Sequence, residues 1–281
     1  MDHKTVLLTG ATSGIGEQTA WALARQSFNL YLLVRNTAKG EQLKREIITE
    51  TSNPNIAVVP CDLADMQSVA NAVALIRTRL DTIDVLINNA GGIFPERQLT
   101  KDGIECTFAT NHLGHFVLTL SLMPLLQKGQ ARVINVSSDA YKQARVNFHD
   151  LQLKNNYSPL RAYGNAKLFN IYFTRSLNER FASKGVTAYC LHPGVINTHF
   201  GEGSTGLVKL LLRIARPFMK TPEQGAETTV YLATEPGIEH LSGSYFKNRK
   251  PVRDASAALH NNSARQKLWV KSTELAKEYL V

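Results

Sequence analysis

Short β-branched and apolar runs alternate with segments of helical periodicity along most of the chain. The strand-like runs occupy residues 5–9, 30–34, 56–60, 83–88, 132–136, 186–192 and 244–246. Between them, apolar residues recur at helical spacing, as in 17–26 and in the late stretch 266–280. This alternation is typical of a parallel sheet wrapped by helices, with ligands at the carboxyl ends of the strands. We therefore predict a doubly wound α/β fold with a mainly parallel, seven-stranded sheet and helices on both faces.

A glycine-rich turn, GATSGIG, separates the first predicted strand from the first predicted helix. Gly10 permits a tight turn, Gly14 lets the backbone approach a pyrophosphate, and Gly16 allows close packing of the helix. Free N–H groups at the start of a helix attract an anion. The spacing Gly-x-x-x-Gly-x-Gly differs from the commoner Gly-x-Gly-x-x-Gly. The turn predicts a Rossmann-type dinucleotide site, with candidate cofactor-binding residues Gly10, Ser13, Gly14, Ile15 and Gly16.

A tyrosine and a lysine lie four residues apart in the segment YGNAK. On a helix, this spacing places the Tyr163 phenol and the Lys167 ammonium one turn apart on the same face. A tyrosine titrates near pH ~10, so proton transfer at neutral pH requires a pKa lower by a few units, on the order of 4 kcal/mol. A neighbouring cation supplies much of that change. The pair is a candidate acid–base site, although two half-solvated side chains would share the same spacing.

Four sequence blocks in a fixed order carry a family resemblance. They are TGATSGIG at 9–16, NNAGG at 88–92, NVSS at 135–138 and YGNAK at 163–167, joined by TNHLGHF at 110–116 and HPG at 192–194. With these motifs the chain resembles the short-chain dehydrogenase/reductase family over most of its length. The segments NHLGHF, KTPEQGA and LSGSYF, and the long gap from Ser138 to Tyr163, look like its retinol dehydrogenase branch.

The resemblance implies a set of catalytic roles. In the reductive direction, Tyr163 donates the proton to a carbonyl oxygen that Ser138 polarises. Ser137 is a competing choice for this role. Adjacent strand residues point to opposite faces, so only one of the two serines can face the substrate. Lys167 is expected to bond the nicotinamide ribose and to lower the pKa of Tyr163. Asn111 is expected to hold a water in a proton relay, and its alternative is a core or capping asparagine.

The second predicted strand ends at Arg35, where an acidic residue would bond the adenosine ribose and an arginine attracts a 2′-phosphate. NADP(H) is therefore favoured over NAD(H), although Arg35 could also be a solvent-exposed cap of the strand. Asp62 resembles the family aspartate that bonds the adenine amino group, and a helix N-cap is its structural alternative. Further cofactor-binding candidates are Leu63, Asn89, Ala90, Gly91, Pro193, Gly194, Val195 and Thr198.

Several other residues lend themselves to competing interpretations. Ala166 stands where the family often has serine, and we expect retained activity because the side chain stays small. His112 and His115 are three apart on a predicted helix, but no third ligand lies at a useful spacing, so we predict packed histidines and no metal. The three cysteines have no paired metal spacing and are expected to be buried, reduced thiols.

Composition bounds the organisation and the partners. The chain has 281 residues, 43% of them hydrophobic, and it lacks an apolar run long enough to span a membrane. We expect a single domain, 1–281, and a cytoplasmic protein, because the first strand starts too early to leave room for a targeting peptide. The formal charge of +9 comes from scattered Lys and Arg, so a solvated face is expected rather than a nucleic-acid partner. A homodimer is left open.

Residues 207–220 form a predicted basic amphipathic helix, with Lys and Arg on one stripe opposite apolar side chains. We interpret the segment at about 199–222 as a substrate lid that could also touch a membrane surface, and an ordinary surface helix is the alternative. The sequence thus predicts an NADP(H)-dependent oxidoreductase that interconverts an apolar aldehyde or ketone and its alcohol. Retinal-like, steroid and xenobiotic carbonyls fit this description. Two alternatives are a carbon–carbon double-bond reductase similar to protochlorophyllide reductase and a non-catalytic NADP(H)-binding redox sensor.

Overall fold

The computed structural model describes residues 4–195, 220–253 and 259–280. Its centre is one sheet with the strand order β3-β2-β1-β4-β5-β6-β7-β8. The strands are β1 (Thr5–Thr9), β2 (Asn29–Val34), β3 (Ile56–Pro60), β4 (Val85–Asn88), β5 (Arg132–Val136), β6 (Thr187–His192), β7 (Tyr245–Lys247) and β8 (Lys250–Pro251). The pairings from β1 to β7 are all parallel, and β8 pairs antiparallel with β7. The predicted doubly wound α/β fold is confirmed, with one short edge strand more than the seven predicted.

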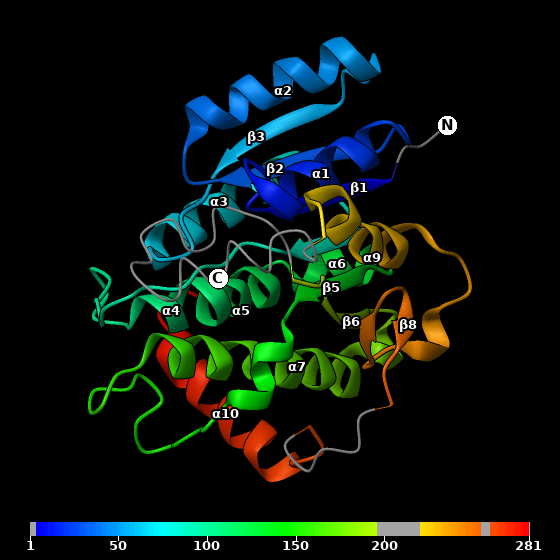
Figure 1. The fold of residues 1–281 in the computed structure, drawn as a ribbon. Coiled ribbons are helices and arrows are strands. Elements are labelled where there is room, and N and C mark those ends of the chain that lie inside the picture. The colour runs from blue at the N-terminus through cyan, green and yellow to red at the C-terminus, as the bar shows by residue number, and fades with distance from the viewer. Residues whose placement is uncertain (1–3, 196–219, 254–258, 281) are drawn as a thin grey trace.

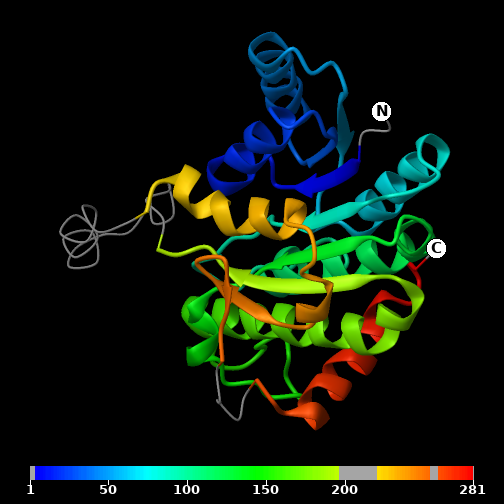
Figure 2. The ribbon, with the colours of Figure 1, turned by 90° about the vertical axis from the view of Figure 1, so that its right-hand side faces the viewer.

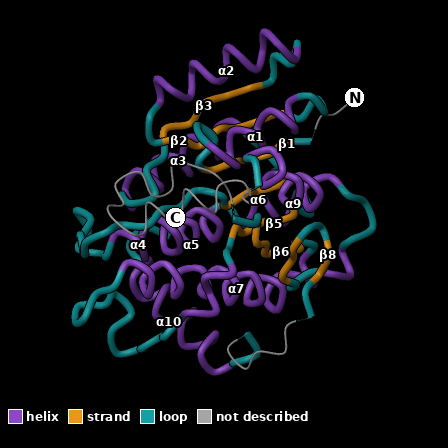
Figure 3. Tube along the Cα trace, in the orientation of Figure 1, coloured by secondary structure: helices purple, strands orange, loops and turns teal. Residues whose placement is uncertain are grey.

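Helices cover both faces of this sheet (Figures 1 and 2). Their bounds are α1 (Gly14–Ala24), α2 (Thr37–Thr51), α3 (Met66–Arg79), α4 (Cys106–Phe108), α5 (Gly114–Ser121), α6 (Met123–Lys128), α7 (Pro159–Phe181), α9 (Pro222–Thr234) and α10 (Asn262–Ala276). Short 3-10 turns lie at η2 (Asp139–Gln143), η3 (Ala182–Lys184) and η5 (Glu239–Leu241), and a π-helical turn, η1 (Ala109–Leu113), joins α4 to α5. Figure 3 shows how helices and strands alternate along the chain, as the sequence pattern predicts.

Alternate strand residues supply two separate cores. Val6 and Leu8 of β1 face the layer of α1, α2 and α9, whereas Leu7 faces the layer of α3, α5 and α7. Because side chains alternate along a strand, Thr9 shares the side of Leu7 and points toward α5. The same alternation directs Ser137, just after β5, toward α7. The alternation of side chains along each strand thus decides which helix layer the polar residue at its end faces.

The carboxyl ends of the parallel strands lie at one edge of the sheet, and the segments that follow them begin there. α10 packs on α7 at the end of the molecule opposite α2 (Figure 1). Cys61, Cys106 and Cys190 are free and buried, as predicted. The described residues contain no helix that is both long and apolar enough to cross a membrane.

Candidate active site

The glycine turn between β1 and α1 forms a cradle that side chains would fill. Gly10 has a φ of +69°, and a Cβ built on it would lie 2.8 Å from the Cα of Ala90. A Cβ on Gly16 would lie 2.0 Å from the carbonyl oxygen of Gly10, and Gly14 has a φ of +55°. Ser13 is the N-cap residue of α1, and its side chain makes no capping bond to the described helix. The first N–H groups of α1 are therefore not capped by the side chain of Ser13, which suits the binding of an anion such as a pyrophosphate.

The loop after β4 closes one side of this cradle. Asn89 donates its side-chain amide to the carbonyl oxygens of Thr9 (2.9 Å) and Gly10 (3.3 Å). The backbone N–H groups of Asn89 and Ala90 both donate to the hydroxyl of Thr9, at 2.9 and 3.0 Å. Asn89 is thus a structural clamp on the glycine turn, and the small residues Ala90 and Gly91 leave the surface of the loop open.

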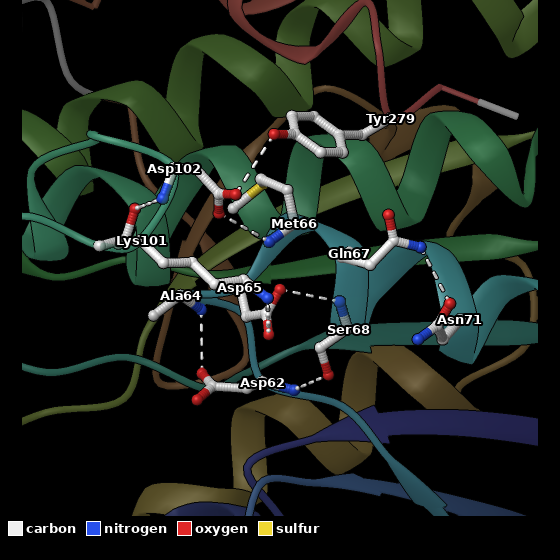
Figure 4. A network of polar contacts seen from close by, with 11 residues as sticks. Asp62, Ala64, Asp65, Met66, Gln67, Ser68, Asn71, Lys101, Asp102 and Tyr279 are labelled. Carbon is white, nitrogen blue, oxygen red and sulfur yellow. Dashed lines mark hydrogen bonds and ion pairs between the residues drawn. The ribbon is translucent and has the colours of Figure 1, made fainter.

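Two candidates for the adenosine end lie at the ends of β2 and β3. Arg35 is exposed directly after β2, next to the N-cap Asn36 of α2. Asp62 follows β3, and its Oδ1 accepts a hydrogen bond from the backbone of Ala64 at 3.0 Å (Figure 4). The side chain that caps α3 is that of Asp65, which accepts from Ser68 N. The N-cap alternative for Asp62 is therefore wrong, because the N-cap residue of α3 is three residues later. Leu63 is buried beside Asp62.

Ser137 and Ser138, adjacent at the end of β5, have different surroundings. Ser137 is 2% exposed, and its hydroxyl donates to the backbone carbonyl of Lys167 at 2.6 Å. Ser138 is partly exposed at the start of η2 and hydrogen-bonds with the side chain of Tyr163. Of the two serines, Ser138 is therefore the one beside the phenol, and Ser137 is occupied by the helix backbone.

Tyr163 and Lys167 lie one turn apart on α7, and the Lys167 ammonium is 5.2 Å from the centre of the Tyr163 ring. Lys167 is buried, and its Nζ donates to the carbonyl of Val136 at 3.2 Å. Burial raises the pKa of Tyr163 to about 12, and the hydrogen bond with Ser138 acts in the opposite direction. Burial also lowers the pKa of Lys167 to about 8. The predicted lowering of the Tyr163 pKa is therefore wrong in direction, because desolvation of the phenolate is the largest effect.

Asn111 lies inside the π-helical turn η1 and is fully buried. Its amide donates to the carbonyl oxygens of Gly92 and Thr107, both at 2.9 Å, and its Oδ1 accepts from Gly92 N at 3.2 Å. A Cβ built on Gly91 would lie 2.4 Å from Asn111 Oδ1 and 3.3 Å from Lys167 Nζ. The side chain is thus anchored to the loop after β4, as the core alternative predicts, and it also borders the site of Lys167.

The segment after β6 borders the same edge. Pro193 is buried, Gly194 has a φ of +107°, and Val195 is 64% exposed. Thr198 and the amphipathic helix predicted at 207–220 lie outside the described residues, except for Lys220. Lys220 N donates to the carbonyl of Val195, and α9 begins at Pro222, the last residue of the predicted lid.

Sequence reasoning missed two polar residues of this region, Thr9 and His115, whose side chains meet at 2.9 Å. The signal available was the second histidine of NHLGHF and the threonine just before the glycine turn. Within the described ranges no group of His, Cys, Asp and Glu could hold a metal, and both His112 and His115 are packed in the interior.

Comparison with known proteins identifies the family. The model of the short chain dehydrogenase family matches residues 4–205. The chain belongs to the short-chain dehydrogenase family. Retinol dehydrogenase 12 of Mus musculus is 40% identical to this short-chain dehydrogenase over 273 residues, covering 97% of the chain and 86% of the relative. The chain is therefore retinol dehydrogenase-like.

Solved structures agree with this assignment. A crystal structure of an uncharacterized protein from Mycobacterium paratuberculosis is 33% identical with a TM-score of 0.77, covering 98% of this chain and 93% of that one. The structure of YwfH, an NADPH dependent reductase, is 22% identical with a TM-score of 0.72, covering 87% of this chain and 96% of that one, and shares the fold. This short-chain dehydrogenase is an oxidoreductase that acts on an alcohol or carbonyl group and uses a nicotinamide cofactor.

Proposed function

We propose that the protein is an NADP(H)-dependent oxidoreductase that interconverts an apolar aldehyde or ketone and its alcohol, with Tyr163 as acid and base. One observation carries this proposal. The side chain of Ser138 is hydrogen-bonded to Tyr163, whose ring lies 5.2 Å from the Lys167 ammonium. Ser138 follows the carboxyl end of β5, so the three groups lie near that edge of the sheet. The Lys167 ammonium also borders Gly91 in the loop after β4.

Each of these residues has a distinct task in the reaction. Ser138 holds the substrate oxygen, because a hydroxyl can donate to a carbonyl and accept from an alcohol. Tyr163 stays protonated at neutral pH, since burial raises its pKa to about 12, and it donates that proton to the oxygen during reduction. When bound, the nicotinamide supplies or accepts the hydride. Lys167 is cationic below about pH 8 and stabilises negative charge on the phenolic oxygen after the proton leaves.

The cofactor would be held by the glycine turn and the loop after β4. The first turn of α1 would face the pyrophosphate, and Asp62 would meet the adenine. Arg35 carries the preference for NADP(H), because its exposed guanidinium at the end of β2 can bind a 2′-phosphate in a bidentate manner. Pro193, Gly194, Val195 and Thr198 are proposed for the nicotinamide side.

The proposed substrate is apolar. A relative that is 40% identical to this chain is named a retinol dehydrogenase, and retinol is a long apolar alcohol. A retinal-like, steroid or xenobiotic carbonyl would present one polar oxygen to Ser138 and Tyr163.

Turnover by the purified chain tests this proposal. NADPH and NADH would each be offered with a panel of apolar aldehydes and ketones, and oxidation of the reduced nicotinamide would be followed by its absorbance. Carbonyl reduction that prefers NADPH is the expected result. Reduction of conjugated double bonds with no carbonyl turnover would replace the proposal with a double-bond reductase, and tight NADPH binding without any turnover would indicate a sensor.

A further inference from the structure

His115 lies buried on α5, beneath the carboxyl end of β1, and is 2% exposed. Its Nε2 is 2.9 Å from the hydroxyl of Thr9, and its Nδ1 is 3.3 Å from the backbone carbonyl of Asn111 in the preceding π-helical turn. Among the described residues, Lys167 on α7 and His112 on η1 interact electrostatically with this imidazole. The ring therefore bridges the cofactor side of the sheet and the asparagine that borders Lys167.

The hydrogen bonds around Thr9 determine which ring nitrogen of His115 carries the hydrogen. The hydroxyl oxygen of Thr9 accepts from the backbone N–H groups of both Asn89 and Ala90, which uses its two lone pairs. Its single hydrogen is left to donate, and His115 Nε2 at 2.9 Å is a nearer acceptor than the carbonyl of Ile87 at 3.3 Å. Nε2 is therefore unprotonated, and Nδ1 carries the hydrogen that the carbonyl of Asn111 accepts. The opposite tautomer would set a third donor against Thr9 and direct a bare Nδ1 at a carbonyl oxygen.

These bonds form a closed circuit around the loop after β4. Thr9 holds the start of the loop through Asn89 and Ala90, and Asn111 holds its other end through two bonds to Gly92. His115 joins Thr9 to Asn111 and so completes the ring. Gly91, between the two anchored ends, is the residue that borders Lys167 Nζ.

We propose that His115 is a positioning residue, a neutral imidazole protonated on Nδ1 that locks residues 89–92 against the glycine turn and beside Lys167. The inference rests on the proposed function in so far as this loop borders the cofactor. His115 touches no reacting atom and acts through Thr9 and Asn111. Burial lowers its pKa to about 3, which agrees with a ring that stays neutral at physiological pH.

His112 provides a matched control three residues earlier. It is 1% exposed, and burial lowers its pKa to about 3 as well. Its Nε2, however, meets the hydroxyl of Ser272 on α10 at 2.9 Å, and not that of Thr9. Loss of either ring would remove a buried imidazole from the same core, but only loss of His115 would open the circuit.

The tautomer can be measured on the wild-type full-length chain without any cofactor. Protein with nitrogen-15-labelled histidine would be studied by NMR at neutral pH, with the ring signals of His115 assigned by their loss in His115→Gln. We expect a neutral ring protonated on Nδ1, unchanged on acidification to about pH 5. A ring protonated on Nε2, or one that titrates near pH ~6.5, would overturn the proposal.

The positioning role is tested by titrating NADPH into His115→Phe, His115→Gln and His112→Phe. We expect His115→Phe to raise the dissociation constant about tenfold, equivalent to about 1.4 kcal/mol. His115→Gln keeps an amide donor and acceptor and should recover most of the affinity, and His112→Phe should stay within about twofold of wild type.

Equal weakening by both phenylalanine variants, or no weakening by His115→Phe, would overturn the role of His115. A wild type that binds neither NADPH nor NADH would instead overturn the proposed function, and with it this role. If His115→Phe does not fold, the tautomer and His115→Gln decide.

Discussion

Ser137 donates a hydrogen bond of 2.6 Å to the backbone carbonyl of Lys167, so that the end of β5 is attached to the helix that carries the candidate acid. Its neighbour Ser138 hydrogen-bonds with Tyr163 instead. The two serines are therefore expected to respond differently to the same substitution. Ser137 attaches β5 to α7, whereas Ser138 holds the substrate oxygen in the proposed reaction.

Ser138→Ala should reduce turnover about a hundredfold, a typical loss for a donor to a developing charge. Its stability should also fall by up to about 1 kcal/mol, because the Ser138 hydroxyl accepts a hydrogen bond from the backbone N–H of Ala140. Ser137→Ala should keep most of its turnover and lose about 1 kcal/mol of unfolding free energy, because a buried hydrogen bond is removed. Steady-state rates and urea unfolding of the two variants would separate these effects. Greater loss of turnover in Ser137→Ala would assign the catalytic hydroxyl to Ser137.

Tyr163→Phe should abolish turnover while NADPH binding survives, because the variant lacks only the phenolic oxygen and its proton. Tyr279→Phe is a suitable control for turnover, since it makes the same change at a tyrosine whose hydroxyl bonds Asp102 and not Ser138 (Figure 4). Turnover and NADPH affinity would be measured for both variants. A Tyr163→Phe rate above about a tenth of wild type, a barrier change below ~1.4 kcal/mol, would mean that Tyr163 is not the acid.

Arg35→Asp should weaken NADPH by at least about tenfold, since an attraction to the 2′-phosphate becomes a repulsion, and should leave NADH little changed. Arg45→Asp, on the exposed face of α2, makes the same change of charge away from the end of β2. Binding titrations with both dinucleotides would show whether the effect belongs to Arg35. A wild type that prefers NADH would rule out the proposed specificity.

Lys167→Met should stabilise the chain at neutral pH while it removes activity. Burial lowers the Lys167 pKa from 10.5 to about 8, so between these values the unfolded chain binds more protons than the folded one and stability rises with pH. At pH ~7 both states are protonated and the full penalty applies, on the order of 3 kcal/mol. Urea unfolding of wild type and variant at neutral pH and near pH ~10 would measure it. A variant less stable than wild type at neutral pH would show that the contacts of the ammonium outweigh its burial.

Local patterns allowed much of this structure to be predicted from the sequence. The glycine turn and the Tyr163–Lys167 pair depend on residues close in the chain, and the structure has both as predicted. The upward shift of the Tyr163 pKa could not be predicted, because it depends on what surrounds the phenol after folding. The contact between Thr9 and His115 joins residues 106 positions apart, which no spacing rule reaches.

The eighth strand was missed for a different reason. β7 and β8 are joined by Asn248 and Arg249, which have φ values of 50° and 62°. Turns of this conformation favour glycine, asparagine and aspartate. Because Arg249 occupies the second turn position, the sequence does not match the usual hairpin signal. β8 is also only two residues long, too short for an alternating pattern to be detected.

The buried histidines predict a loss of stability in mild acid. The pKa values of His112 and His115 are lowered to about 3 by burial, whereas an unfolded histidine titrates near 6.5. Between these values the unfolded chain binds more protons, so the unfolding free energy falls as the pH drops below 6.5, by up to about 1.4 kcal/mol per pH unit for each ring. His112→Phe should reduce the slope of unfolding free energy against pH by the contribution of one bound proton, because one of the two rings is removed. Urea unfolding at a series of pH values from about 7 to 4.5 measures the slopes, and an unchanged slope in His112→Phe would mean that this ring already carries a proton in the folded chain.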